Sequence, residues 1–526
     1  MMPPSQPRKR TTWKRLLLGL IAIAALLAGV RFWKVHQYEQ ELAKLLTQIN
    51  AEDPNWTWER MQAARPVLDP EEDAGVELVE LLKLTTLRET IPRTSRSEWG
   101  RTYQDLFNQN AILNYDAFLE AHPNVTLPAP IKELTEPIMA KEPMAVVLGR
   151  ARGLRHFEEG RLPHTFRQFL MLSLLPDMQG TRAISNLLAW DADLQAHHGQ
   201  SAVAMESIQG MLGVARCLSH DPFVISLLVR SAITNQACRQ TARLLALPLA
   251  FSSDQLRLLQ AEFEREQKLT EGYLTEMMRS ERAVQDHDFA LLAEEKVSLI
   301  EIANSMGVRL KWTTGYAPLD QKLVNAFPEM LYGWGNRPGH SKMERVALLK
   351  FYTEAVRWSA LQEPELLPTL DTWRKNGPFL TPFLRQFLRM MAGNSRDEIK
   401  ELSQLFKLAR SYLVNRAQLR AIIGIIACER YRLEHGSWPT SWGQLTPTYL
   451  KEIPLDPFTG QAMLLKTLPD GLVIYSVGSD GKDDSGDVIR SDHSPKDTGY
   501  RLWHPAQRGI NLDEKFNEEV KKMKQE

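Results

Sequence analysis

The stretch that decides the fold is Asn415-Arg-Ala-Gln-Leu-Arg-Ala-Ile-Ile-Gly-Ile-Ile-Ala-Cys-Glu-Arg-Tyr-Arg-Leu-Glu-His435, which Gly436 follows. Its pattern predicts a helix that the glycine ends. Large apolar residues occur on nearly every side of this helix: Leu419, Ile422, Ile423, Ile425, Ile426 and Leu433. A helix without a polar face is normally covered on several sides. We therefore expect it to lie between an upstream and a downstream layer of the protein.

A small α+β module is predicted around the end of this helix. Two short strands are expected at residues 461–466 and 472–476, joined by the turn Leu468-Pro-Asp-Gly471. A segment rich in Gly and Asp, residues 478–487, follows the second strand. The module is therefore expected to be a helix packed on a short antiparallel β-meander.

Three motifs of this module occur in a fixed order, at Tyr431–Pro439, Pro454–Gly460 and Tyr475–Gly481. This order resembles the major pseudopilin (protein G) of type II secretion systems. There a long helix leads into a Tyr-x-x-x-x-Gly-x-x-Pro turn, a Pro-x-Asp-Pro loop, a meander and a Tyr-Ser-x-Gly-x-Asp-Gly segment. The resemblance implies the same small fold for the C-terminal module and says nothing about the rest of the chain.

The resemblance also implies a calcium site, because the acidic loop of that family binds Ca²⁺. Calcium prefers hard oxygen ligands on a flexible loop. The candidate ligands here are Asp480, Asp484 and Asp487. The loop is shorter than the family's loop and lacks its paired glycines. The alternative is a polar Asp/Gly turn that holds no metal.

The start of the chain departs from that family. A pseudopilin has a prepilin-peptidase site, Gly-Phe-Thr-Leu-x-Glu, directly before its membrane helix, whereas this chain has Trp13-Lys-Arg-Leu-Leu-Leu18 and no glutamate. Basic residues precede an uncharged run from Leu16 to Val30, which the Phe32-Trp33 pair extends. Such a pattern predicts a single membrane anchor with its N-terminus in the cytoplasm. A cleaved signal peptide is the alternative, and either one exports the remaining chain.

Between these ends the chain predicts helices. The clearest block runs from Gly180 to Gln267, where Asp221-Pro222 and Ser253-Asp254 are expected to begin two of its helices. Consecutive helix pairs joined by short loops are typical of an α-solenoid-like array, although no strict repeat period is present. The fold class is therefore mainly α. The expected segments are a basic cytoplasmic segment 1–15, an anchor 16–33, a helical domain 34–410 with a loop-rich insertion 309–341, the pseudopilin-like module 411–490, and a polar tail 491–526 containing a short helix from Asp513 to Lys522.

Composition excludes some classes of function. Lys and Arg number 64, as do Asp and Glu, so the net charge is zero and nucleic-acid binding is not indicated. The chain has 3 cysteines, which do not form a disulfide framework. Buried free thiols are expected, and a Cys217–Cys238 bridge is the alternative in an oxidising compartment.

No catalytic motif stands out. The segment Gly333–Lys342 resembles a phosphate loop, but His340 stands where the Walker pattern requires lysine. The sequence also lacks H-E-x-x-H, G-x-S-x-G and cysteine pairs at zinc spacing. A pocket formed by His197, His198, Glu206 or Asp221 would indicate an enzyme.

These patterns predict a membrane-anchored extracytoplasmic scaffold or adaptor without evident catalysis. It would lie at the bacterial inner membrane with its bulk in the periplasm, and it would bind a protein partner, such as a component of the secretion machinery. Two alternatives remain open. One is an exported envelope-associated hydrolase with its site in the helical domain, and the other is an atypical pseudopilus component.

Overall fold

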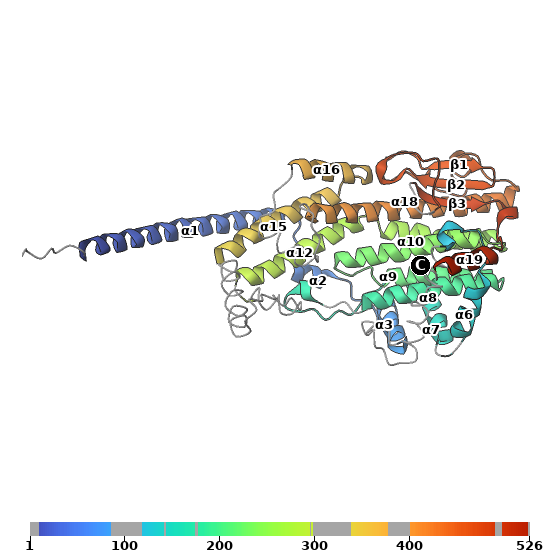
Figure 1. Cartoon of the computed structure of the whole chain (residues 1–526), viewed down its shortest axis with the longest axis horizontal. Helices are drawn as coiled ribbons and strands as arrows, with labels where there is room; N and C mark the ends of the chain where they lie inside the picture. The colour runs from blue at the N-terminus through green and yellow to red at the C-terminus, as the bar shows by residue number, and fades with distance from the viewer. Residues whose placement is uncertain are drawn as a thin grey trace, which may run out of the picture.

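The computed structural model describes residues 10–85, 118–140, 142, 144–173, 177–294, 296–297, 338–376, 400–489 and 497–523. Within them the fold is mainly α with one small antiparallel sheet, as expected (Figure 1). The helices are α1 Arg10–Glu52, α2 Trp58–Ala64, α3 Ala74–Thr85, α6 Ala129–Met139, α7 Met144–Gly153, α8 Asp177–His197, α9 Ser201–Arg216, α10 Val224–Leu245, α11 Ser253–Leu269, α12 Tyr273–Ala293, α15 Pro338–Ser359, α16 Leu366–Asn376, α18 Lys400–His435 and α19 Asp513–Met523. The strands are β1 Leu464–Leu468, β2 Gly471–Ser476 and β3 Thr498–Trp503.

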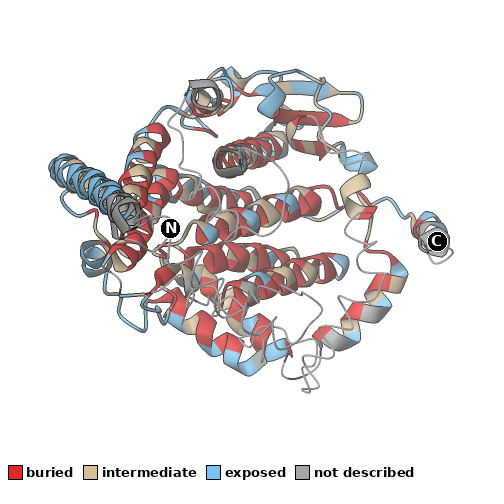
Figure 2. Ribbon diagram, turned by 60° about the vertical axis from the view of Figure 1, so that its left-hand side comes forward, coloured by how far each residue is buried: buried red, intermediate tan, exposed pale blue. Residues whose placement is uncertain are grey.

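Helix α18 lies between the sheet and the helical body. It packs against β2 and β3 on one side and against α10 and α11 on the other. Ile422, Ile425 and Ile426 are fully buried between these layers, as Figure 2 shows for the central helices. This placement explains why the helix is apolar nearly all round. The helix begins at Lys400, so the expected module boundary at residue 411 falls inside it.

The sheet has the order β1-β2-β3, and both pairs of strands are antiparallel. The first two strands form the expected hairpin, with Leu468 opposite Gly471 at its turn. The third strand was not expected. It lies in residues 491–526, which we assigned to a polar tail, and that assignment is wrong. Tyr500 and Leu502 of β3 are buried, so this segment completes the core of the module.

Residues 504–516, the C-terminal strap, return from β3 to the helical body. The backbone N–H of Gly509 donates to the Ala246 carbonyl at 3.2 Å, and that of Ile510 donates to the Asn124 carbonyl at 3.0 Å. Phe516 of α19 packs edge-on against Phe118, with ring centroids 5.0 Å apart. The terminal helix expected from Asp513 is present, but it is docked on the body through this aromatic contact.

The block between residues 180 and 267 forms α8, α9, α10 and α11, and their apolar faces meet in one core. Two expected caps are corrected. Helix α11 is capped by Ser252, in a reciprocal capping box with Gln255, because the Ser252 side chain accepts from the backbone of Gln255. Helix α10 begins after Phe223 and has no side-chain cap, because Asp221 accepts from the Phe223 backbone and the Ser226 hydroxyl and contacts His164 instead.

A second core joins α12, α15, α16 and the first half of α18. The second half of α1 packs along α15, where Arg357 pairs with Glu52 at 2.8 Å. Pro338 to Lys342 form the first turn of α15, so helix resumes earlier than the expected position near Met343. The rest of the insertion 309–341 lies outside the described residues, as do the first nine residues of the basic segment 1–15.

The first half of α1 projects away from the body (Figure 1). It exposes large apolar side chains: Leu17, Leu18, Ile21, Ile23, Leu26, Val30, Phe32 and Trp33. In the part of the chain that the structure describes, no helix is both long and apolar enough to cross a membrane.

Candidate functional site

Asp221, in the loop between α9 and α10, makes a buried contact with His164, which lies in the segment before α8. His164 Nε2 contacts Asp221 Oδ2, and the side chains are 1% and 0% exposed. The other carboxylate oxygen, Oδ1, accepts hydrogen bonds from the Ser226 hydroxyl and from the Phe223 backbone, the latter at 3.2 Å. A carboxylate that burial has removed from water needs such donors. Asp221 therefore orients an imidazole inside the helical body.

A carboxylate that holds one imidazole nitrogen leaves the other available for proton transfer or binding. His164 Nδ1 is buried and has no hydrogen-bond partner. Acyl transfer by a Ser-His-Asp triad requires a serine hydroxyl that is hydrogen-bonded to one imidazole nitrogen while the carboxylate holds the other. Here the Ser226 hydroxyl donates to the carboxylate instead. The described contacts thus supply a positioned histidine without a nucleophile.

Aromatic rings pack beside the His164–Asp221 pair. Trp58 of α2 meets Phe166 edge-on, with centroids 5.0 Å apart, and its ring lies 6.3 Å from that of Phe223. The His164 ring lies 6.0 Å from Phe166 and 6.2 Å from Phe223. These rings exclude water and join α2 to the loop before α10. They also place the start of α2 near His164 and Asp221, which together with Arg65 we call the polar cluster.

Arg65 follows the last residue of α2. Its Nη1 donates to Gln62 Oε1 at 3.0 Å, while its Nε and Nη2 are buried and have no partner. Burial and, to a lesser extent, the like charge of Arg161 lower the pKa of Arg65 to about 10. The negative charge of Asp221 raises the pKa of Arg65, so the two side chains are close enough to interact electrostatically. Arg65 is thus a half-buried cation whose donors are only partly satisfied.

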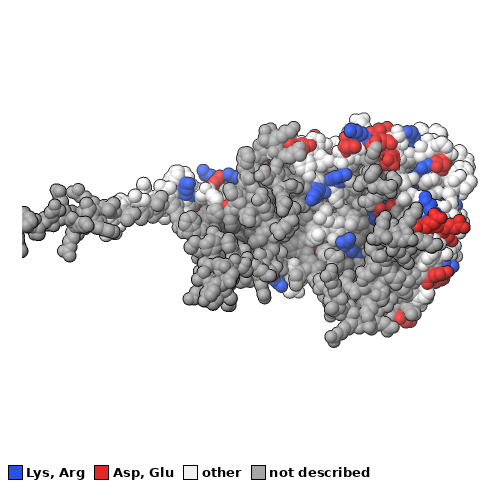
Figure 3. All heavy atoms as spheres, in the orientation of Figure 1, with Lys and Arg blue, Asp and Glu red and all other residues white. Residues whose placement is uncertain are grey.

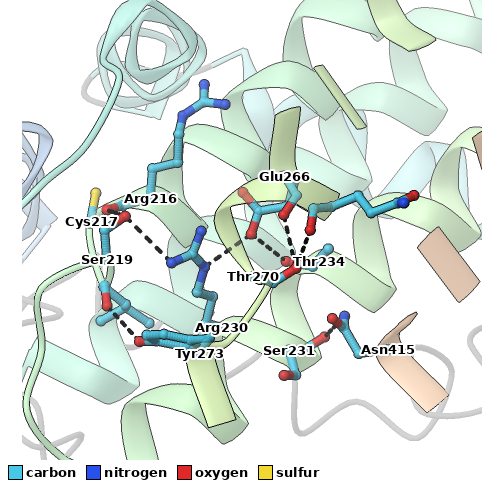
Figure 4. A network of polar contacts seen from close by, with 12 residues as sticks. Arg216, Cys217, Ser219, Arg230, Ser231, Thr234, Glu266, Thr270, Tyr273 and Asn415 are labelled. Carbon is cyan, nitrogen blue, oxygen red and sulfur yellow. Dashed lines mark hydrogen bonds and ion pairs between the residues drawn. The ribbon is translucent and has the colours of Figure 1, made fainter. Parts of the chain in front are cut away.

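The polar cluster continues into the helical body as a buried pair between Arg230 of α10 and Glu266 of α11 (Figure 4). Arg230 Nε donates to Glu266 Oε1 at 2.9 Å, and the side chains are 2% and 0% exposed. The Arg230 guanidinium also lies over the Tyr273 ring, 5.1 Å from its centroid. Burial raises the pKa of Tyr273 to about 12, so its hydroxyl stays protonated and donates to the Leu218 carbonyl at 2.9 Å. Removing these ions from water costs free energy, and replacing one partner would leave the other as an unpaired buried charge.

Helix α18 is connected to this cluster by Arg416. Its Nη1 donates to the Gln267 carbonyl and, at 3.1 Å, to the Thr270 hydroxyl. Its Nε donates to Glu363 at 2.8 Å. A cation at these carbonyls also complements the negative end of the α11 dipole. The helix that carries the sheet is therefore joined by hydrogen bonds to the polar centre of the body.

In the C-terminal module, Asp456 organises the Pro454–Gly460 loop. Its carboxylate is buried and accepts from the Ser476 hydroxyl at 2.8 Å and from the backbone of Val477 at 3.1 Å. It also accepts from Phe458 N at 2.8 Å, which closes the turn of its own loop. The aspartate of this motif therefore joins the loop to the end of β2.

The acidic loop after β2 is held by a carboxylate that the sequence did not single out. Asp497 is 1% exposed and accepts from the backbone of Gly486 at 2.8 Å and of Asp484 at 3.4 Å. Asp480 accepts from the Lys482 backbone at 3.1 Å, and both Asp480 and Asp487 are exposed. Burial raises the pKa of Asp497. No group of three or more possible metal ligands is present among the described residues.

The other residues singled out from sequence lie apart. His198 pairs with Glu136 at 2.9 Å and meets the ring of its neighbour His197, while Glu206 pairs with Arg155 at 3.2 Å. Only Asp221 belongs to the polar cluster. The three thiols are free and buried, which confirms that expectation, and the alternative Cys217–Cys238 bridge is absent.

Comparison of the chain with models of protein families, with characterised proteins and with solved structures yields no match.

Proposed function

We propose that this protein is a membrane-anchored extracytoplasmic scaffold that holds a pseudopilin-like module on a helical body for a protein partner. The observation that carries the proposal is the position of α18. Because this helix is buried between the sheet and α10 and α11, the module and the body share one core and move together. A unit built in this way is better suited to presenting a binding surface to a protein partner than to catalysing a reaction.

The first half of α1 supports the anchoring part of the proposal. Leu18, Leu26 and Phe32 are 64%, 68% and 77% exposed on a helix that projects from the body. Apolar area of this size is stabilised outside water, by about 25 cal/mol for each Å² removed from it. We infer that this half enters the apolar layer of the bacterial inner membrane, with the body in the periplasm.

The charge distribution supports a protein partner over a nucleic acid. Acidic and basic side chains lie side by side on the face seen in Figure 3, and the chain as a whole is neutral. A nucleic-acid-binding face would instead gather positive charge. The pseudopilin-like motifs make secretion machinery the partner class to test first, with calcium at Asp480, Asp484 and Asp487 as part of the same proposal.

Fractionation of cells expressing the full chain tests the anchor. We expect the protein in the membrane pellet after an alkaline carbonate wash. A Leu18→Lys, Ile21→Lys, Leu26→Lys variant should move to the soluble fraction. A Val67→Lys control, at a residue 93% exposed outside α1, should stay in the pellet. Release of the unaltered protein by the carbonate wash would contradict the proposal.

Purification from detergent-solubilised membranes, followed by mass spectrometry, tests the partner. We expect secretion-system components to accompany the full chain. Variants that alter the acidic loop should lose them while still folding, as judged by the melting temperature. Recovery of the chain alone, with or without calcium, would contradict the adaptor role.

A further inference from the structure

The end of α2 carries three hydrogen-bond donors that lack acceptors. They are Arg65 Nε, Arg65 Nη2 and Gln62 Nε2, and all three atoms are buried. Gln62 and Arg65 contact each other directly, since Gln62 Oε1 accepts from Arg65 Nη1. Buried polar groups in folded proteins are nearly always paired, because an unpaired one costs about 1–3 kcal/mol. Three unpaired donors on two adjoining side chains therefore give this site an unused capacity to donate hydrogen bonds to an acceptor.

Neighbouring acidic groups are already engaged by other donors. Asp221 is held by His164 and Ser226. Asp73 accepts from the backbone of Gly75 at 2.7 Å and of Arg161 at 2.8 Å. Neither forms a hydrogen bond with Arg65 in the described residues.

The free edge of the guanidinium identifies the chemistry of such an acceptor. Nε and Nη2 point in parallel from one side of the planar group, and this edge matches the two oxygens of a carboxylate. We propose that Arg65, held by Gln62, binds the carboxylate of an acidic ligand, either a small organic acid or the C-terminus of a peptide. The guanidinium takes both oxygens through Nε and Nη2, while Gln62 Oε1 stays on Nη1 and positions the group. His164 Nδ1, which is also unpaired, lies in the same polar cluster.

The segment that follows Arg65 is at the surface of the protein. Val67 in this segment is 93% exposed, and Arg65 itself is half-buried. Arg161 Nη1 donates to the Pro66 carbonyl at 3.4 Å. The residues next to Arg65 along the chain are therefore at the surface and not in a core.

Two conservative variants test the site in the full-length protein. Gln62→Glu places a carboxylate against Arg65 Nη1 and neutralises the guanidinium, so it should raise the melting temperature and weaken the response to ligand. Arg65→Lys keeps the charge but removes the paired edge, and it should weaken binding at least about tenfold. Arg60→Gln, at an exposed arginine of the same helix, is the control that should bind normally.

The probes are sodium acetate, sodium chloride at equal ionic strength, and trialanine with a free or an amidated C-terminus. Binding is followed by calorimetry and by the melting temperature. A response to acetate identifies a small organic acid, and a response to free trialanine alone identifies a peptide C-terminus. Equal responses to acetate and chloride, or a response to carboxylate that persists in both variants, would overturn the proposal. So would the absence of any response.

Discussion

Arg508 and Glu429 form a two-pronged ion pair between the C-terminal strap and α18. Nη1 lies 2.7 Å from Oε1 and Nη2 lies 3.0 Å from Oε2, and the side chains are 5% and 4% exposed. Arg432, one helical turn along α18, contacts the same carboxylate at 2.8 Å but is 22% exposed. The strap and the helix are therefore joined by one buried carboxylate shared by two guanidinium groups.

Replacing Arg508 with Ala is expected to lower the free energy of unfolding by about 3 kcal/mol, because it leaves a buried charge with one partner. Replacing the more exposed Arg432 should cost only about 1 kcal/mol. Urea unfolding of the two variants measures the difference. Equal losses would show that burial does not set the strength of these pairs.

The same carboxylate should make the protein sensitive to acid. Burial by itself raises the pKa of Glu429, but the hydrogen bonds from Arg432 and Arg508 outweigh it and hold the pKa at about 2, below the usual 4.5. The stability from this depressed pKa is present above pH 4.5 and is lost as the pH falls through 2. Between pH 6 and pH 3 the protein should lose about 2 kcal/mol more than Glu429→Gln does. Parallel urea-unfolding profiles for the two proteins would contradict this.

Asp288 of α12 is expected to make the protein less stable as the pH rises, the opposite of the effect of Glu429. Burial raises its pKa to about 7, although the backbone N–H groups of Met171 and Leu170 donate to it and the charge of His287 acts to lower it. Glu281 contributes a further small rise. A raised pKa gives stability that is present below pH 3.8 and lost as the pH rises through 7. From pH 5 to pH 8 the protein should lose about 3 kcal/mol more than Asp288→Asn.

That comparison is made by urea unfolding at both pH values, with Glu281→Gln as a second variant. Burial also raises the pKa of Glu281, so its removal should take away the contribution of that group and leave most of the contribution of Asp288 in place. An Asp288→Asn profile that runs parallel to the unaltered protein would show that Asp288 stays ionised in the fold.

Replacing two helical glycines with alanine should change the stability of the protein in opposite directions. A Cβ at Gly213 of α9 would lie 2.4 Å from the carbonyl oxygen of Leu154, a backbone atom that cannot move aside. Gly213→Ala should therefore destabilise the protein by about 2 kcal/mol. Gly149 of α7 has no atom within 4 Å of the same position, and Gly149→Ala should stabilise by about 0.5–1 kcal/mol. Thermal unfolding of both variants checks the sign, and a neutral Gly213→Ala would mean that α9 can move away from Leu154.

The proposed calcium site can be separated from the internal support of its loop. Replacing Asp480 and Asp487 with Ala should abolish any rise in melting temperature caused by calcium and leave the calcium-free value unchanged. Replacing Asp497 with Asn should lower the melting temperature with or without calcium, because two backbone donors lose a charged acceptor. If neither calcium nor a chelator changes the melting temperature of the full chain, the proposed metal site is contradicted.

Local patterns allowed much of the helical body to be predicted. The apolar spacing of α8 to α11 and the Leu468-Pro-Asp-Gly471 turn were recognised because each depends on residues a few positions apart. Strand β3 was missed because its charged and polar flanks resemble a tail, and its burial depends on β2. The cap expected at Asp221 was wrong for a related reason, since one oxygen of its carboxylate contacts a distant histidine.

By itself the sequence determined the periodicity of the helices, the burial of the middle of Asn415–His435 and the hairpin that follows; the last turn of that helix, with Leu433 41% exposed, is at the surface. These depend on spacing along the chain, where helix and strand geometry bring near neighbours together. Only the tertiary structure decided which polar groups meet. His164 and Asp221 are 57 positions apart, and Arg508 and Glu429 are 79 apart. No local geometry joins residues at such separations, so their contacts arise only when α18, the body and the strap pack around common cores.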